Sequence, residues 1–119
     1  MNNNPIGVYD SGIGGLTVFS KLVKLLPNEN FIYFGDTANI PYGTKSKEEL
    51  LVITHKIMNI FKNFNVKGVV MACNTTSAVA YDTLKNDYDF TLYPVIQTAC
   101  KVIAEMGIKK IGTLSTEAT

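Results

Sequence analysis

The stretch Gly68-Val69-Val70-Met71-Ala72-Cys73-Asn74-Thr75-Thr76 joins a continuous apolar run to a segment of helical character. Residues 69–72 predict a strand buried on both faces, and residues 75–85 predict the helix that follows it. A strand that leads directly into a helix is typical of parallel α/β units. Cys73 lies at this junction, where unpaired backbone N–H groups and the positive end of the helix dipole favour a thiolate.

Two interpretations of Cys73 are open from this stretch alone. In the first, Asn74, Thr75 and Thr76 surround the sulfur with small hydrogen-bonding side chains, which suit a carboxylate or phosphate ligand. In the second, Cys73 is a buried structural residue, and Asn74 or Thr75 acts as a helix N-cap. Free cysteines are often simply buried, so the stretch does not decide between a ligand site and a packed thiol.

The alternation of strands and helices extends over the whole chain. Apolar runs predict further strands at 5–9, 31–34, 93–96 and from 110 to 114. Helices are predicted between them by apolar spacing at Leu16, Phe19, Val23 and Leu26, at Leu50, Thr54, Ile57, Phe61 and Phe64, and over 98–106. The pattern predicts an α/β fold, a doubly wound parallel sheet flanked by helices. Because Thr119 directly follows a strand-like run, we expect this unit to be incomplete.

Composition narrows the class of protein. Hydrophobic residues make up 46% and charged residues 18% of the chain, a balance typical of globular rather than disordered proteins. The net charge of +1 argues against a nucleic-acid partner, and no apolar stretch reaches the roughly 18 residues of a membrane span. The first residues lack a secretory signal, and two cysteines are too few for a disulfide scaffold. We therefore expect a cytoplasmic protein with reduced thiols.

Polar residues follow nearly every predicted strand. They are Asp10-Ser11, Asp36-Thr37, Cys73-Asn74-Thr75-Thr76, Gln97-Thr98 and Ser115-Thr116. Because the carboxyl ends of parallel strands meet at one edge of the sheet, where such folds bind ligands, we expect these groups to converge around Cys73.

Two glycine-containing segments belong to this edge. Asp10-Ser11-Gly12-Ile13-Gly14-Gly15-Leu16 is either an anion cradle or a tight strand–helix turn. It lacks the dinucleotide fingerprint because Thr17 replaces the last glycine, and Gly43-Thr44-Lys45-Ser46 is not a Walker A loop. Pro41-Tyr42-Gly43-Thr44 forms either a pocket wall or an ordinary surface turn.

The remaining candidates for chemistry are few. His55 falls on the helix face opposite Ile57, so we expect a solvated residue rather than a Cys–His dyad or a histidine metal site. Cys100 is expected to be a small core residue. It forms no C-x-x-C pair with Cys73, which leaves a thioredoxin-like redox role without its motif.

Taken together, the motifs resemble those of the glutamate racemases, within the cofactor-independent aspartate/glutamate racemase superfamily. The resemblance rests on residues 10–16, on Asp36-Thr37 leading to residues 41–44, and on Ala72-Cys73-Asn74-Thr75, which occur in the family's order and spacing. Thr116-Glu117-Ala118-Thr119 also resembles a segment from the start of the family's second domain. The resemblance implies most of a first α/β domain at 1–96 and a truncated second domain at 97–119.

Members of this family are isomerases that interconvert L- and D-glutamate and so supply D-glutamate for peptidoglycan. The resemblance implies that two cysteines on opposite faces of the α-carbon move the proton, with no pyridoxal phosphate and no metal. It assigns Cys73 as the first of these cysteines, with Asp10 nearby. Glutamate's polar groups would be held by Ser11, Tyr42, Gly43, Asn74 and Thr75.

One departure from the family pattern concerns the second cysteine. In the family it lies in a Gly-Cys-Thr-His stretch, which does not occur here, and Ala99-Cys100-Lys101 does not replace it. We therefore expect the 119-residue chain alone to be inactive. Aspartate or another acidic amino acid remains an alternative substrate, and a homodimer is possible. A non-catalytic anion-binding module and a thiol enzyme with Cys73 as nucleophile are the alternatives from other classes.

Overall fold

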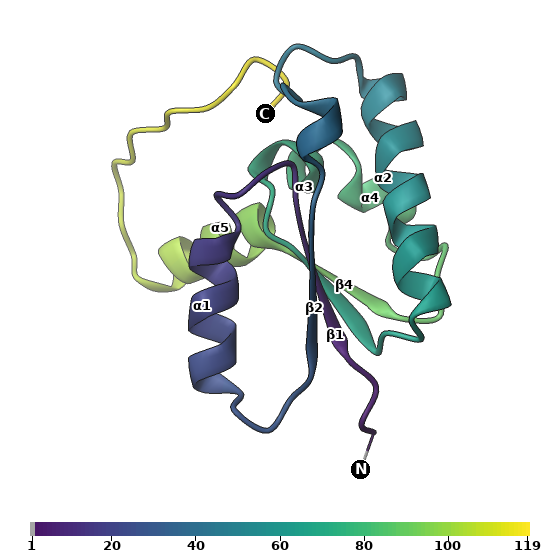
Figure 1. Cartoon of the computed structure of the whole chain (residues 1–119). Helices are drawn as coiled ribbons and strands as arrows, with labels where there is room; N and C mark the ends of the chain where they lie inside the picture. Colours follow the sequence, from purple (N-terminus) through teal and green to yellow (C-terminus); the bar gives the residue numbers. More distant parts are fainter. Residues whose placement is uncertain (1) are drawn as a thin grey trace.

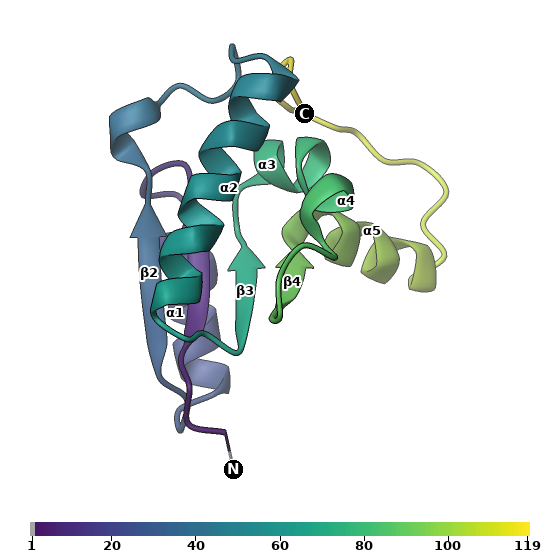
Figure 2. The ribbon, with the colours of Figure 1, turned by 90° about the vertical axis from the view of Figure 1, so that its right-hand side faces the viewer.

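A four-stranded parallel sheet forms the centre of the computed structural model, which describes residues 2–119. The strands lie in the order β2-β1-β3-β4, as Figure 2 shows. Their bounds are Ile6–Asp10 for β1, Phe31–Gly35 for β2, Gly68–Met71 for β3 and Thr91–Pro94 for β4. All three pairings are parallel, which confirms the predicted α/β class.

Helices flank both faces of this sheet, as a doubly wound arrangement requires. Figure 1 shows α1 and α5 on one side of the sheet and α2 and α4 on the other. The helices are α1 (Leu16–Leu25), α2 (Lys47–Asn63), α3 (Asn74–Val79), α4 (Tyr81–Leu84) and α5 (Val95–Glu105), with a 3-10 turn η1 at Thr37–Asn39. The short α3 lies between the two sides and contacts both α2 and α5. Within residues 2–119, no helix combines the length and apolar character needed to cross a bilayer.

The core lies between α2 and the sheet. Leu50, Met58 and Phe61 of α2 are fully buried, together with Val69 of β3. A capping box at Ser46 and Glu49 starts the helix, and the predicted stripe at 50, 54, 57 and 61 faces inward. Phe64 is the exception to the predicted stripe. It is 55% exposed because α2 ends at Asn63, one residue before it.

The opposite face of the sheet is open. Neither α1 nor α5 has a buried residue, and a hollow of about 370 Å³ is lined mainly by Ile6, Leu22, Leu26, Val70 and Tyr93. Cys100 on α5 is exposed, so its prediction as a core residue is wrong. No described element packs over its side of α5 closely enough to bury it.

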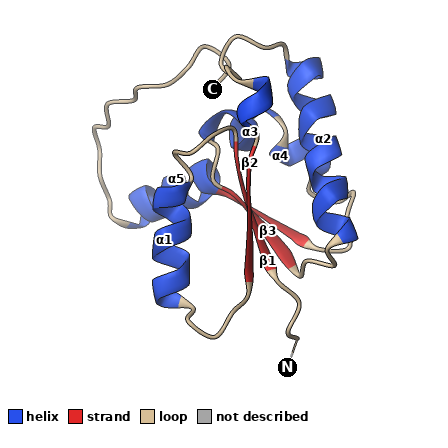
Figure 3. Cartoon of the chain, in the orientation of Figure 1, coloured by secondary structure: helices blue, strands red, loops and turns tan. Residues whose placement is uncertain are grey.

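Three predicted boundaries are corrected by the structure. The fourth strand is 91–94 rather than 93–96, because α5 already begins at Val95. The helix predicted over 75–85 is divided at Ala80 into α3 and α4. Residues 110–114 form no strand, because no described strand lies beside them to pair with. They belong to the long irregular segment that returns from α5 toward the carboxyl ends of the strands (Figure 3).

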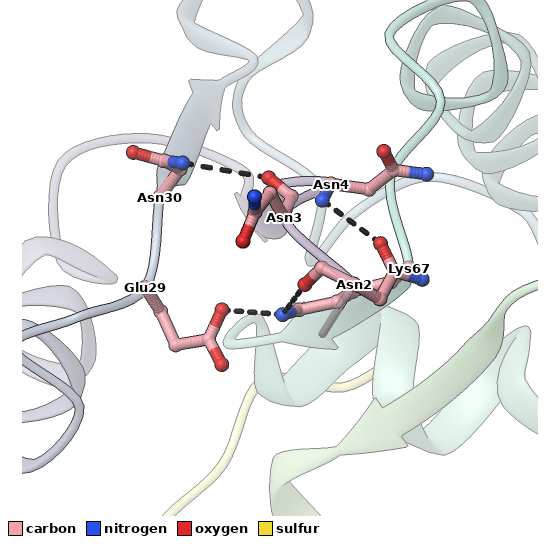
Figure 4. A network of polar contacts seen from close by, with 6 residues as sticks. All are labelled: Asn2, Asn3, Asn4, Glu29, Asn30 and Lys67. Carbon is pink, nitrogen blue, oxygen red and sulfur yellow. Dashed lines mark hydrogen bonds and ion pairs between the residues drawn. The ribbon is translucent and has the colours of Figure 1, made fainter.

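A polar network holds the amino-terminal edge of the sheet (Figure 4). Lys67 Nζ donates to the carbonyl oxygen of Asn2 at 2.8 Å and pairs with the Glu29 carboxylate. Asn30 Nδ2 donates to the carbonyl oxygen of Asn3 at 3.4 Å. This edge therefore joins the loops before β1, β2 and β3, and the opposite edge carries the residues singled out above.

Candidate functional site

The parallel register aligns the carboxyl ends of β1, β2 and β3. Tyr9 is paired with Phe34 and with Met71, and Asp10 with Gly35. The chain therefore leaves the sheet at the same height at Asp10, Asp36 and Cys73. This confirms the convergence of polar strand ends predicted for these three segments.

The loop after β1 is closed around the Asp10 carboxylate. Asp10 Oδ2 accepts hydrogen bonds from the backbone N–H groups of Gly12 at 3.1 Å and Gly15 at 2.9 Å. A Cβ on Gly15 would approach the Asp10 Cβ to 2.5 Å, so only glycine allows this closure. Two amides that an anion cradle would offer are therefore already bonded to Asp10. The tight-turn interpretation describes the loop better.

Tyr33 on β2 supports the same loop from the neighbouring strand. Its hydroxyl donates to the carbonyl oxygen of Gly12 at 2.7 Å. Partial burial and the nearby charge of Asp10 raise the pKa of Tyr33 above its ordinary value, which keeps the phenol in its donating form.

Cys73 is the N-cap residue of α3 and is 5% exposed. Its carbonyl oxygen accepts from the backbone N–H of Ser77 at 3.0 Å and from Thr76 Oγ1 at 3.4 Å. The prediction of Asn74 or Thr75 as N-cap is wrong, because α3 already begins at Asn74. Cys73 is thus buried at the margin of the core, as the second interpretation expects, and a ligand site around its sulfur remains a prediction.

The segment after β2, residues 36–43, lines this edge of the sheet as a wall. At Tyr42 it is buried and does not form a surface turn. Tyr42 is 3% exposed, and its hydroxyl donates to Asp36 Oδ2 at 2.5 Å. The hydroxyl of Tyr9 on β1 donates to the Tyr42 oxygen at 2.8 Å, and Asn39 Nδ2 reaches both Asp36 oxygens at 2.8 Å. Burial is the main cause that raises the pKa of both tyrosines, and the bond to Asp36 adds to it for Tyr42.

The irregular segment at the carboxyl end of the chain meets this wall. Thr75 Oγ1 lies 3.2 Å from Thr116 Oγ1 and 3.1 Å from Thr119 Oγ1, and the last two hydroxyls are 2.9 Å apart. A Cβ on Gly43 would lie 2.8 Å from the Thr116 Cβ. Thr116 therefore bridges the Gly43 wall and the start of α3, and Figure 1 shows the C-terminus at that position.

The structure does not join every predicted residue to this cluster. Asn74 is exposed, and Ser11 is half-buried in the loop after β1. Gln97 packs α5 against α3 by donating to the Ser77 carbonyl oxygen at 2.9 Å. His55 on α2 is exposed, as predicted, and its Nδ1 lies 2.6 Å from the Tyr88 hydroxyl.

Sequence reasoning missed two residues of the edge. Tyr9 and Tyr33 each make a hydrogen bond to a residue of a predicted motif, and neither is predicted to take part in the site. The available signal was a polar tip on an otherwise apolar strand for the two tyrosines. Among residues 2–119, no three His, Cys, Asp or Glu side chains are grouped as a metal site.

Comparisons with known proteins point to one family. No protein-family model matches the chain. A glutamate racemase of Trichormus variabilis is 50% identical over 115 residues, which make up 97% of this chain and 39% of that protein. The chain therefore spans less than half the length of the curated relatives it matches.

Solved structures agree with this match. The glutamate racemase of Thermus thermophilus in complex with Beta-chloro-D-alanine superposes with a TM-score of 0.90 at 41% identity, over 98% of this chain and 44% of that one. The glutamate racemase of Francisella tularensis in complex with D-glutamate gives a TM-score of 0.90 at 39% identity, over 99% and 44%.

Proposed function

We infer that this chain supplies one half of a site that interconverts L- and D-glutamate. The chain belongs to the glutamate racemases and matches their amino-terminal part. The observation that carries the proposal is the position of Cys73. It lies at the polar edge of the sheet, two residues before Thr75, whose hydroxyl oxygen is 3.2 Å from Thr116 Oγ1. The rest of the proposed site lies in the region of the longer relatives that this chain does not match.

In this proposal Cys73 exchanges a proton with one face of the α-carbon. Cys73 acts as the thiolate: the Cα–H bond breaks, an S–H bond forms on Cys73, and the electron pair of the broken bond is delocalised into the substrate carboxylate. A second thiol then gives its proton to that electron pair from the opposite face and is left as a thiolate, which inverts the centre. Cys100 does not serve as that thiol in this proposal, because Ala99-Cys100-Lys101 lacks the Gly-Cys-Thr-His pattern of the family's second cysteine. The second thiol therefore belongs to the part of the racemase that this chain does not span.

The proposed contacts to glutamate divide by chemistry. Ser11, Asn74 and Thr75 offer side-chain donors to carboxylate oxygens, and aligned donors stabilise the carbanion-like state. Tyr42 contributes together with Gly43 through the backbone, because its phenol is directed into the core toward Asp36. Asp10 places negative charge near the α-ammonium group.

Two alternative functions use the same edge of the sheet. A non-catalytic anion-binding module would use free amides of the glycine loop, and those of Gly12 and Gly15 are bonded to Asp10. Aspartate or another acidic amino acid remains an alternative substrate for the same chemistry. The domain division at 96, the cytoplasmic location, the homodimer and the supply of D-glutamate to peptidoglycan remain predictions.

Isotope exchange tests the proposed function. The protein expressed from its complete reading frame is incubated with L-glutamate in D₂O, and deuterium at the α-carbon is followed by NMR. We expect exchange and racemisation that Cys73→Ala abolishes and Cys100→Ala leaves unchanged. Exchange that survives Cys73→Ala would contradict the proposal. A trapped thioester or other adduct on Cys73 would instead support a nucleophilic thiol enzyme.

A further inference from the structure

We propose that Tyr9 is a positioning residue of the glutamate site, which acts through Tyr42 and Asp36 without touching substrate. The inference rests on the proposed function and names a residue that the family motifs in this chain do not include. It starts from a buried chain of three polar groups that runs from β1 to the segment after β2.

Each group in this hydrogen-bonded series, from Tyr9 through Tyr42 to Asp36, has a defined partner. Tyr9 is fully buried in β1, and its hydroxyl donates to the Tyr42 oxygen at 2.8 Å. Tyr42 uses its own proton for Asp36 Oδ2 at 2.5 Å, and both oxygens of Asp36 also accept from Asn39. Each phenol therefore has one defined donor direction, which a hydroxyl free to rotate would lack.

The segment from 36 to 43 needs such an anchor because it is not part of the sheet. Beyond the 3-10 turn η1 it has no regular structure, and no strand pairs with it in the described residues. Tyr9 belongs to a central strand that is paired on both sides. The hydrogen bond between the two hydroxyls thus ties the irregular segment to a strand that is held by hydrogen bonds on both sides.

The two tyrosines also precede the proposed contacts to glutamate in sequence. Tyr9 directly precedes Asp10, and Tyr42 directly precedes Gly43. Gly43 faces Thr116 so closely that a Cβ would lie 2.8 Å from the Thr116 Cβ. A shift of Tyr42 would therefore move the Gly43 backbone against Thr116 and change the mouth of the site. Such a shift affects binding of glutamate before it affects the proton transfer at Cys73.

Kinetics of hydroxyl deletions test this inference. In the protein expressed from its complete reading frame, Tyr9→Phe is expected to raise KM for glutamate about threefold with kcat nearly unchanged, the scale of one neutral hydrogen bond. Tyr42→Phe removes the middle of the chain and a bond to a carboxylate, so we expect an increase of about tenfold or more. Tyr93→Phe is the matched control, because it removes the same atom from a tyrosine that is 53% exposed on β4.

The double variant distinguishes positioning from a general loss of stability. If Tyr9 acts only through Tyr42, the double variant should have the same KM as the Tyr42→Phe single variant. An additive increase in the double variant would contradict the proposal. So would a Tyr9→Phe variant with a lowered melting temperature and an unchanged KM, because that result describes a purely structural hydrogen bond.

Failure of the inference can be told from failure of the proposed function. If the unsubstituted protein does not racemise glutamate, the proposed function fails and KM is not measurable. The role of Tyr9 is then tested by calorimetry of D-glutamate binding to the same variants. We expect Tyr42→Phe to weaken the affinity more than Tyr9→Phe does, and the double variant to be no weaker than Tyr42→Phe. An active protein whose KM and glutamate affinity are unchanged by Tyr9→Phe would overturn the inference alone.

Discussion

The hydroxyl of Tyr33 on β2 donates a 2.7 Å hydrogen bond to the carbonyl oxygen of Gly12, in the loop that follows the neighbouring strand β1. The same loop is closed from within by the Asp10 carboxylate, which accepts from Gly12 and Gly15. One glycine residue is therefore held on both its N–H and its C=O groups. This fixes the position of Ser11, which Gly12 directly follows.

Removal of the Tyr33 hydroxyl is expected to loosen this loop. Tyr33→Phe leaves the Gly12 carbonyl without its partner, and we expect a loss of about 1 kcal/mol in the free energy of unfolding. We also expect a raised KM for glutamate. Urea unfolding and steady-state kinetics on the protein from its complete reading frame measure both. Tyr93→Phe serves as control, and equal stability of the two variants would contradict the prediction.

A side chain at position 43 is expected to damage the site. Gly43→Ala places a Cβ 2.8 Å from the Thr116 Cβ and 2.9 Å from its Cγ2, so the wall or the segment carrying Thr116 must move. We predict a fall of about tenfold or more in kcat/KM. Gly112→Ala, where nothing lies within 4 Å of the new Cβ, should leave kcat/KM unchanged. A Gly43→Ala enzyme with full activity would show that the contact with Thr116 does not shape the site.

Stability is expected to fall at alkaline pH because of Tyr9 and Tyr42. Burial raises the pKa of both phenols, whereas in the unfolded chain they ionise near their ordinary value of about 10. Below that pH both states are protonated and the contribution does not change. Above it the native state binds more protons than the unfolded state, so each tyrosine lowers stability by up to about 1.4 kcal/mol per pH unit.

Unfolding in denaturant between about pH 9 and pH 11.5 measures this decline. The Tyr9→Phe and Tyr42→Phe double variant should show a flatter pH dependence than the unsubstituted protein. An identical slope in the two proteins would contradict the prediction.

The open face of the sheet is expected to cause self-association when residues 1–119 are made alone. The hollow between α1 and the sheet exposes apolar side chains, and Leu26 lines it while Leu25 does not. Such a patch favours association. Sedimentation should show oligomers that Leu26→Lys reduces more than Leu25→Lys does. A monomer that melts cooperatively without either substitution would contradict this expectation.

Much of the architecture was predictable because its signals are local. Apolar runs at 31–34 and 69–72 and the stripe at 50, 54, 57 and 61 correctly predicted strands and a helix, since side-chain periodicity follows from backbone geometry. The placement of Asp10 and Cys73 at one edge followed from parallel pairing alone. The strand predicted at 110–114 was wrong because a strand exists only with a neighbour to bond, and that neighbour is not a local property.

Local sequence patterns were enough to predict the parallel α/β class, the order of most of its elements and the match of its motifs to the glutamate racemases. Only the tertiary structure decided which side chains meet. Tyr9 and Tyr42 are 33 residues apart, and Thr75 and Thr116 are 41 apart, yet each pair is in hydrogen-bond contact. Such contacts depend on how irregular segments pack against the sheet, and no local pattern records that packing. The direction of the Tyr42 phenol, into the core rather than toward a ligand, is decided in the same way.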